Sequence, residues 1–376
     1  MKPIPPSSAA ASTGAQSRFA AVYRVLADAI AARAFPGCAF GVVAGGEVVL
    51  KDALGHFTYD ADSPRVAPYT VFDVASLTKV VATTSMAMLL HQRGQLFLDT
   101  PLGHLLPEFL VGRPTAEHAD RVTLRHLLAH NSGLPGYIEF FRTAKTPDEL
   151  LRACLSLPLT AEPGTRAEYS DPGFILLGNA LEHIAHEPLA SWTRREVFQP
   201  LAMAATGFCP SPAARPTIPP TEDDTTFRMR RIQGEVQDEN ASILHGVAGH
   251  AGLFSTVPEL LTFAQAILPA DAKTEIGVAK PLLFAAETVN IFAQRQGPAG
   301  SSCALGWDTP SDNSTSGKYF SQHSIGHLAY SGCSLWIDLD AAISVVLLTN
   351  RTWPDRRSQL IREVRPAFHN ALREKL

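Results

Sequence analysis

Two strand-like hairpins near opposite ends of the chain constrain the fold more than any other feature. The apolar runs 38–45 and 47–55 are separated by a glycine, a pattern that predicts the first hairpin. The runs 328–339 and 341–350 are rich in β-branched and aromatic residues and predict the second. Most segments between the hairpins repeat apolar residues at helical spacing. We therefore expect one sheet completed by both chain ends, with a helical block inserted between them.

The same order of elements predicts the domain organisation. We expect residues 1–17 to form a flexible tail, 18–80 and 241–376 to form an α/β sheet domain, and 81–240 to form a mostly helical domain. Clustered prolines within 205–240 predict a long irregular excursion.

Helical periodicity also predicts three helices in the sheet domain. They cover about 18–33, 258–267 and 355–376, and Pro366 is expected to kink the last.

Charge and hydropathy argue against nucleic-acid and membrane partners. A formal net charge of −4 with scattered arginines gives no basic surface for phosphates. No segment reaches the roughly 18 apolar residues that span a bilayer, and residues 1–17 lack the apolar run of a secretory signal. We expect a cytoplasmic location, although a longer leader would leave the periplasm open. The oligomeric state is left open.

Cysteine and histidine spacing predicts no metal site and no cofactor. The five cysteines form no C-x-x-C pair, and H-E-x-x-H and G-x-S-x-G are absent. His250, set among glycines, is expected to help shape a cleft.

The first candidate for chemistry is Ser76 with Lys79. A strand-like run ends and a helix begins at Ser76, and residues three apart on a helix share a face. The Lys79 amine can therefore reach the hydroxyl and act as its base, provided that its pKa is lowered by burial or a positive field. Alone, the pair favours a helix-capping serine and an exposed lysine over a catalytic pair.

The second candidate is Tyr169 with Asp171, in a short loop before another predicted helix. A phenol beside a lysine ammonium ionises more easily and can share proton transfer. The alternative is a surface tyrosine with Asp171 as the helix cap.

The third candidate is His327, at the entrance of a predicted strand. The small residues Ala329 and Gly332 would let a substrate approach that strand edge. The amides of Tyr330 and Ser76 could together hold an oxyanion. A lone histidine there could equally be a polar cap.

In this order, the three candidates resemble the S-x-x-K, Y-x-N and K-T-G motifs of the class C β-lactamase and penicillin-binding-protein superfamily. Further segments, such as LRHLLAHNSGLPGY and GVAGHAGLFST, resemble its esterase-like subgroup, and the resemblance covers about 18–370. It implies an antiparallel sheet flanked by helices, an inserted helical domain, and the site between them.

The resemblance also implies roles for the candidate residues. Ser76 is the acylated nucleophile, Lys79 and Tyr169 transfer protons, and the Ser76 and Tyr330 amides form the oxyanion hole. Asp171, His327 and Ala329 stand where the family has Asn, Lys and Gly.

These departures shape the expected substrate. A neutral imidazole at His327 would leave a substrate carboxylate without a fixed cation, unless a nearby Asp171 raised the histidine pKa. We therefore expect an esterase or D-amino-acid peptidase acting on a small ester or peptide-like substrate, such as a cell-wall fragment. The alternatives are a class C type β-lactamase and a weakly catalytic ligand-binding homologue.

Overall fold

A five-stranded antiparallel sheet forms the centre of the protein, whose computed structural model describes residues 17–114, 118–268, 283–312 and 314–376. The strand order is β2-β1-β10-β9-β8. These strands are β1 Gly37–Ala44, β2 Glu47–Gly55, β8 Ser324–Leu328, β9 Ser334–Asp338 and β10 Ile343–Thr349.

Both ends of the chain complete this sheet. Strand β1 pairs with β2 on one side and with β10 on the other, and Cys38 lies opposite Thr349. This confirms the predicted fold class, because the hairpin near each chain end contributes adjacent strands to one antiparallel sheet.

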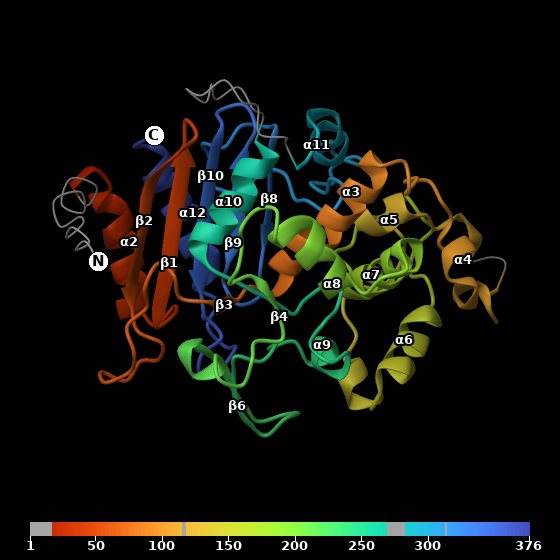
Figure 1. Ribbon diagram of the computed structural model, residues 1–376, viewed down its shortest axis with the longest axis horizontal. Helices are drawn as coiled ribbons and strands as arrows, with labels where there is room; N and C mark the ends of the chain where they lie inside the picture. Colours follow the sequence, from red (N-terminus) through yellow and green to blue (C-terminus); the bar gives the residue numbers. More distant parts are fainter. Residues whose placement is uncertain (1–16, 115–117, 269–282, 313) are drawn as a thin grey trace, which may run out of the picture.

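Helices cover both faces of the sheet (Figure 1). Helices α2 (Ala20–Ala31) and α12 (Ile361–Arg373) pack on one face, and α10 (Val257–Ile267) lies on the other. Alternate residues of β1 serve the two cores: Phe40 faces α2 and α12, whereas Val43 belongs to the core that includes α10. Strand β1 is therefore buried on both faces, as its continuous apolar sequence indicates.

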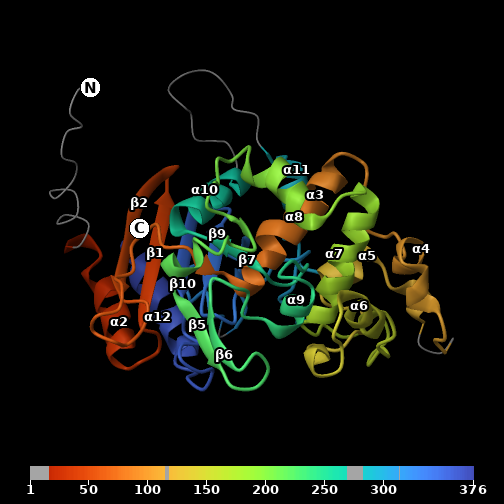
Figure 2. The ribbon, with the colours of Figure 1, turned by 60° about the horizontal axis from the view of Figure 1, so that its bottom comes forward.

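Most of the remaining helices lie beyond the β8 edge of the sheet (Figures 1 and 2). They are α3 Ser85–Gln92, α4 Leu102–Leu105, α5 Leu124–Leu128, α6 Pro147–Leu155, α7 Asp171–Ala185, α8 Leu189–Thr193, α9 Glu239–Ile243 and α11 Ala286–Ala293. None of the helices in the described ranges is both long and apolar enough to cross a bilayer. The predicted domain boundaries stay a prediction, and residues 1–16 of the predicted tail lie outside the described residues.

The expectation that 205–240 is irregular was wrong. This range contains β4 (Gly207–Phe208), β5 (Pro220–Asp224) and β6 (Arg230–Gln233). Strand β4 joins β3 (Phe72–Asp73) and β7 (Leu253–Ser255) in a second sheet, while β5 and β6 form a hairpin. Proline at the first position of a strand is tolerated, so Pro220 does not prevent pairing.

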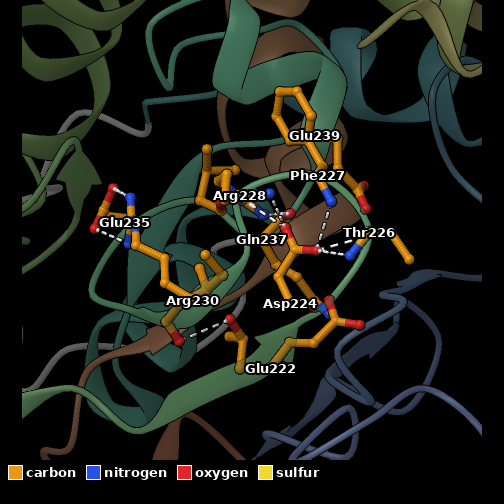
Figure 3. A network of polar contacts seen from close by, with 12 residues as sticks. Glu222, Asp224, Thr226, Phe227, Arg228, Arg230, Glu235, Gln237 and Glu239 are labelled. Atoms are coloured by element: carbon orange, nitrogen blue, oxygen red, sulfur yellow. Dashed lines mark hydrogen bonds and ion pairs between the residues drawn. The ribbon is translucent and has the colours of Figure 1, made fainter. Parts of the chain in front are cut away.

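The turn of the β5–β6 hairpin is held by one carboxylate (Figure 3). Asp224 accepts hydrogen bonds from the backbone N–H groups of Thr226, Phe227 and Arg228. Burial would raise the pKa of Asp224, but these hydrogen bonds lower it below its ordinary value. The Arg228 guanidinium in turn donates to the Gln237 carbonyl, which connects the hairpin to the segment leading into α9.

Candidate active site

Ser76 lies in a tight turn that directly follows β3. Ala75 has a left-handed backbone with φ of 44°, which is costly for a residue with a Cβ. Asp73 supports this conformation: its Oδ1 accepts the Ala75 N–H at 2.8 Å and its Oδ2 accepts the Gln237 N–H at 2.7 Å. Ser76 follows in a 3₁₀ turn, Ala75–Leu77. Sequence analysis missed Asp73, although an aspartate just after a strand-like run was a detectable turn signal.

Lys79 begins the π-helical turn Lys79–Thr84 and is fully buried. Its Nζ lies 3.3 Å from Ser76 Oγ, 2.6 Å from Asp171 Oδ1 and 3.1 Å from the His250 carbonyl oxygen. The ammonium therefore has one acceptor for each of its three N–H bonds.

The condition that the Lys79 pKa be lowered is not met in the resting protein. Burial lowers the pKa, but the charge of Asp171, together with Tyr169, outweighs it and raises the pKa above its ordinary value. In the resting protein Lys79 is thus an ammonium paired with a carboxylate.

Tyr169 covers the Lys79 amine. The Lys79 Nζ lies 4.8 Å from the centre of the Tyr169 ring. The centres of the His130 and Tyr169 rings are 4.6 Å apart. Burial raises the Tyr169 pKa and the Lys79 charge offsets this only in part, so the phenol keeps its proton. The expectation of easier ionisation was therefore wrong for the resting state.

Asp171 is the first residue of α7, and Ser170 is the cap. The Ser170 hydroxyl accepts the Gly173 N–H at 3.0 Å. With capping assigned to Ser170, Asp171 pairs with Lys79 instead. The two residues are 92 positions apart, which explains why no local pattern indicated the pair.

His327 is the penultimate residue of β8, not the start of a strand. It is 5% exposed, and its Nδ1 donates to the Leu328 carbonyl oxygen at 2.7 Å. Burial and the nearby Lys79 charge lower the His327 pKa to about 3. The imidazole is therefore neutral, and the suggestion that Asp171 raises its pKa was wrong because Asp171 bonds to Lys79.

A tight turn separates β8 from β9, so the predicted continuous strand 328–339 was wrong. The Ala329 N–H donates to the Cys333 carbonyl oxygen, and Gly332 has φ of 96°. Arg365 donates to the Ala329 and Cys333 carbonyl oxygens and Arg351 to that of Tyr330. These arginines lie far along the chain, so no local pattern could reveal this turn.

Ala329 and Tyr330 differ in exposure within this turn. Ala329 is buried, whereas the Tyr330 side chain is 51% exposed. Within the described ranges, the Tyr330 N–H donates to no acceptor of the chain itself, so it is available to a ligand.

Sequence analysis assigned no contact to Asp238 or His250. The two side chains meet at 2.9 Å between Oδ1 and Nε2. Burial would raise the Asp238 pKa, but His250 and the Ala241 N–H lower it to about 2. No group of three or more His, Cys, Asp or Glu side chains among the described residues is arranged to hold a metal ion.

The sequence matches the family model described as Beta-lactamase over residues 22–367. It is 29% identical over 351 residues to an N-acetylmuramyl-L-alanine amidase of Bacillus subtilis, covering 85% of this chain and 78% of that protein. It is 26% identical to a putative D-alanyl-D-alanine carboxypeptidase of Escherichia coli K12, covering 84% and 79%.

Two solved structures share the fold over nearly their full length. EstCE1, a hydrolase with promiscuous acyltransferase activity, superposes with a TM-score of 0.72 at 22% identity, covering 94% of this chain and all of that one. A penicillin-binding-protein homologue from Caulobacter crescentus gives 0.74 at 18% identity, covering 96% and 98%.

Proposed function

Since this chain belongs to the β-lactamase family of serine hydrolases, we propose that it hydrolyses small esters or peptide-like amides through an acyl-enzyme on Ser76. The observation that carries the proposal is the contact of the buried Lys79 amine with both the Ser76 hydroxyl and Asp171. A buried amine 3.3 Å from a serine hydroxyl is placed to exchange a proton with it.

In acylation, Ser76 Oγ attacks the substrate carbonyl while the hydroxyl proton passes to the neutral form of Lys79. The new ester bond forms at Oγ, and the proton then moves through the Tyr169 phenol to the leaving group as its bond to the carbonyl breaks. Water attacks the ester in the second half of the reaction and restores Ser76. Because the resting Lys79 is an ammonium, the reactive enzyme is its deprotonated fraction, and the rate should rise with pH.

The developing oxyanion would be held by the amides of Ser76 and Tyr330. Removing one such donor typically costs about 10²–10³ in rate. The turn between β8 and β9 would set this geometry, since Arg365 and Arg351 hold its carbonyl groups.

The charges around the site favour substrates without a carboxylate beside the scissile bond. His327 is neutral, and Arg351 and Arg365 donate to backbone carbonyl groups. Arg356 is paired with Glu222 and Glu239. β-Lactams and D-alanyl peptides carry such a carboxylate, so esters and amides lacking it are the preferred class, and a cell-wall fragment is one candidate source.

A substrate panel tests the proposal. We expect p-nitrophenyl esters to be hydrolysed faster than a cephalosporin or a D-Ala-D-Ala peptide, and Ser76→Ala to abolish each activity. Turnover of the cephalosporin at the rate of the short esters would contradict the substrate class. Full activity of Ser76→Ala would contradict the nucleophile.

The other function class is a homologue that binds a ligand without turnover. The replacement of the family asparagine by Asp171 favours it, because an ionised carboxylate can only accept hydrogen bonds. Mass spectrometry after exposure to a fluorophosphonate separates the two: an adduct on Ser76 supports the hydrolase, and an unlabelled protein supports the binding homologue.

A further inference from the structure

Two side chains from one helical turn reach neighbouring carbonyl groups of a buried segment, Gly249–His250. Lys79 Nζ donates to the His250 carbonyl oxygen at 3.1 Å, and Thr83 Oγ1 donates to the Gly249 carbonyl oxygen at 2.6 Å. Lys79 and Thr83 both have no exposed surface. The segment thus presents two successive acceptors to the turn that carries the candidate base.

The other side of this segment packs directly against the α7 backbone. A Cβ added to Gly249 would lie 2.1 Å from the Phe174 carbonyl oxygen and 3.1 Å from the Cα of Gly178. No side chain fits there, so Gly249 allows the segment to be clamped between α7 and the Lys79–Thr84 turn.

The His250 side chain provides a further tie. Its Nε2 lies 2.9 Å from Asp238 Oδ1, and the same carboxylate caps α9 by accepting the Ala241 N–H at 2.7 Å. The His250 side chain is almost fully buried, so water competes little for its contact with Asp238. His250 is therefore held through its side chain as well as through the neighbouring carbonyl of Gly249.

The position of the His250 carbonyl determines where the Lys79 lone pair points. A neutral amine has two N–H bonds and one lone pair. Asp171 Oδ1 and the His250 carbonyl oxygen accept the two N–H bonds, and the remaining direction faces Ser76 Oγ. If the carbonyl moved, an N–H bond of Lys79 would turn toward another acceptor and the lone pair would leave the hydroxyl.

We propose that Thr83 and the Asp238–His250 pair are positioning residues for Lys79, because they fix the carbonyl that directs its lone pair at Ser76. The inference rests on the proposed acyl-enzyme at Ser76. It assigns these residues no contact with substrate.

A matched pair of variants at Thr83 tests the inference in the full-length protein. Thr83→Val keeps the shape and removes the donor, whereas Thr83→Ser keeps the donor. We expect kcat/KM for p-nitrophenyl acetate to fall about tenfold in Thr83→Val, since small misplacements of a catalytic group cost one to two orders of magnitude. Thr83→Ser should stay within about twofold of the parent protein.

The pH profile separates positioning from a general loss of structure. The carbonyl stabilises the ammonium more than the amine, so weakening its contact should move the acid limb of kcat/KM to lower pH while the plateau falls. A purely structural defect would lower the plateau and leave the limb in place. Thr217→Val is the control, because it also removes a threonine hydroxyl that donates to a backbone carbonyl, that of Ala214, but at an exposed position, and it should leave the profile unchanged.

A second pair covers the case in which Thr83→Val does not fold. His250→Gln can still donate to Asp238 and should keep the parent profile, whereas His250→Leu cannot and should show the loss and the shift. Parent-like kinetics in Thr83→Val would overturn the inference. If that variant does not fold, parent-like kinetics in His250→Leu would overturn it. Equal losses in the two members of either matched pair would also overturn it. Loss of activity in Ser76→Ala alongside normal Thr83→Val kinetics would reject the positioning role alone; an active Ser76→Ala would reject the proposed function itself.

Discussion

Lys79 and His327 are two buried nitrogen bases that both lie next to the Tyr169 ring, and they differ in charge. Burial lowers the pKa of both. Lys79 has a carboxylate at 2.6 Å, which restores its charge, whereas the Nδ1 of His327 donates to the carbonyl of Leu328. A nearby carboxylate, rather than the depth of burial, therefore decides which of the two bases is charged.

The carboxylates of Asp73 and Asp238 show the same contrast. Burial raises the pKa of Asp73 to about 6, even though the acid accepts two backbone N–H groups. Asp238 is only partly buried; burial would raise its pKa, but His250 brings it down to about 2. At Asp73 the two backbone donors offset burial only in part, whereas at Asp238 the imidazole partner helps to reverse the effect of burial on the pKa.

The largest expected effect comes from removing the Lys79 amine. Lys79→Met keeps most of the side-chain volume but removes the proton acceptor of Ser76. We expect kcat/KM for p-nitrophenyl acetate to fall about 10³-fold, within the range that general-base catalysis contributes. Steady-state kinetics over pH 6–10 would measure it.

The matched control is Lys51→Met, which removes an amine exposed on β2 far from Ser76 along the chain. It should leave the rate unchanged. Activity of Lys79→Met within tenfold of the parent protein would mean that Lys79 is not the base, however well its charge is explained.

A smaller effect is expected when the carboxylate beside Lys79 is neutralised. Asp171→Asn removes the charge that raises the Lys79 pKa, so that burial dominates and the pKa falls. The acid limb of the pH–rate profile should then move to lower pH by about one unit or more. The control is Asp99→Asn, which removes an exposed carboxylate paired with Arg125. An acid limb that stays in place in Asp171→Asn would mean that Asp171 does not set the charge of Lys79.

The sequence predicts the strands and helices around Ser76 better than it predicts the charge states of Lys79 and His327. The two hairpins predicted how β1, β2, β9 and β10 join in one sheet, because strand periodicity and turn residues are local properties. Helical spacing likewise predicted that the Lys79 amine could reach the Ser76 hydroxyl.

The charge state of Lys79 could not be predicted in the same way. It depends on Asp171, which arrives from a different helix, and on a backbone carbonyl at His250, which has no sequence signature. The β8–β9 turn was missed for a related reason, because Arg365 holds it from α12. The catalytic roles of Ser76, Lys79 and Tyr169 stay predictions until the kinetics are measured.

The smallest expected effect concerns the neutral His327 and the pH dependence of stability. The folded protein keeps His327 neutral down to about pH 3, whereas an unfolded histidine takes up a proton near pH 6.5. Its contribution to stability is therefore complete above about pH 6.5 and is lost as the pH falls toward 3. His327→Gln cannot be protonated, so between pH 7.5 and 6 it should lose about 1 kcal/mol less free energy of unfolding than the parent protein.

Urea unfolding of both proteins at several pH values would measure this difference. His323→Gln is the matched control, because it removes an exposed histidine whose surface contact with Asp340 contributes little to stability. Parallel stability curves for the parent protein and His327→Gln would mean that His327 takes up a proton in the folded protein as readily as in the unfolded chain. The site would then contain a second cation at low pH, and substrates without a carboxylate would be preferred only above the histidine pKa.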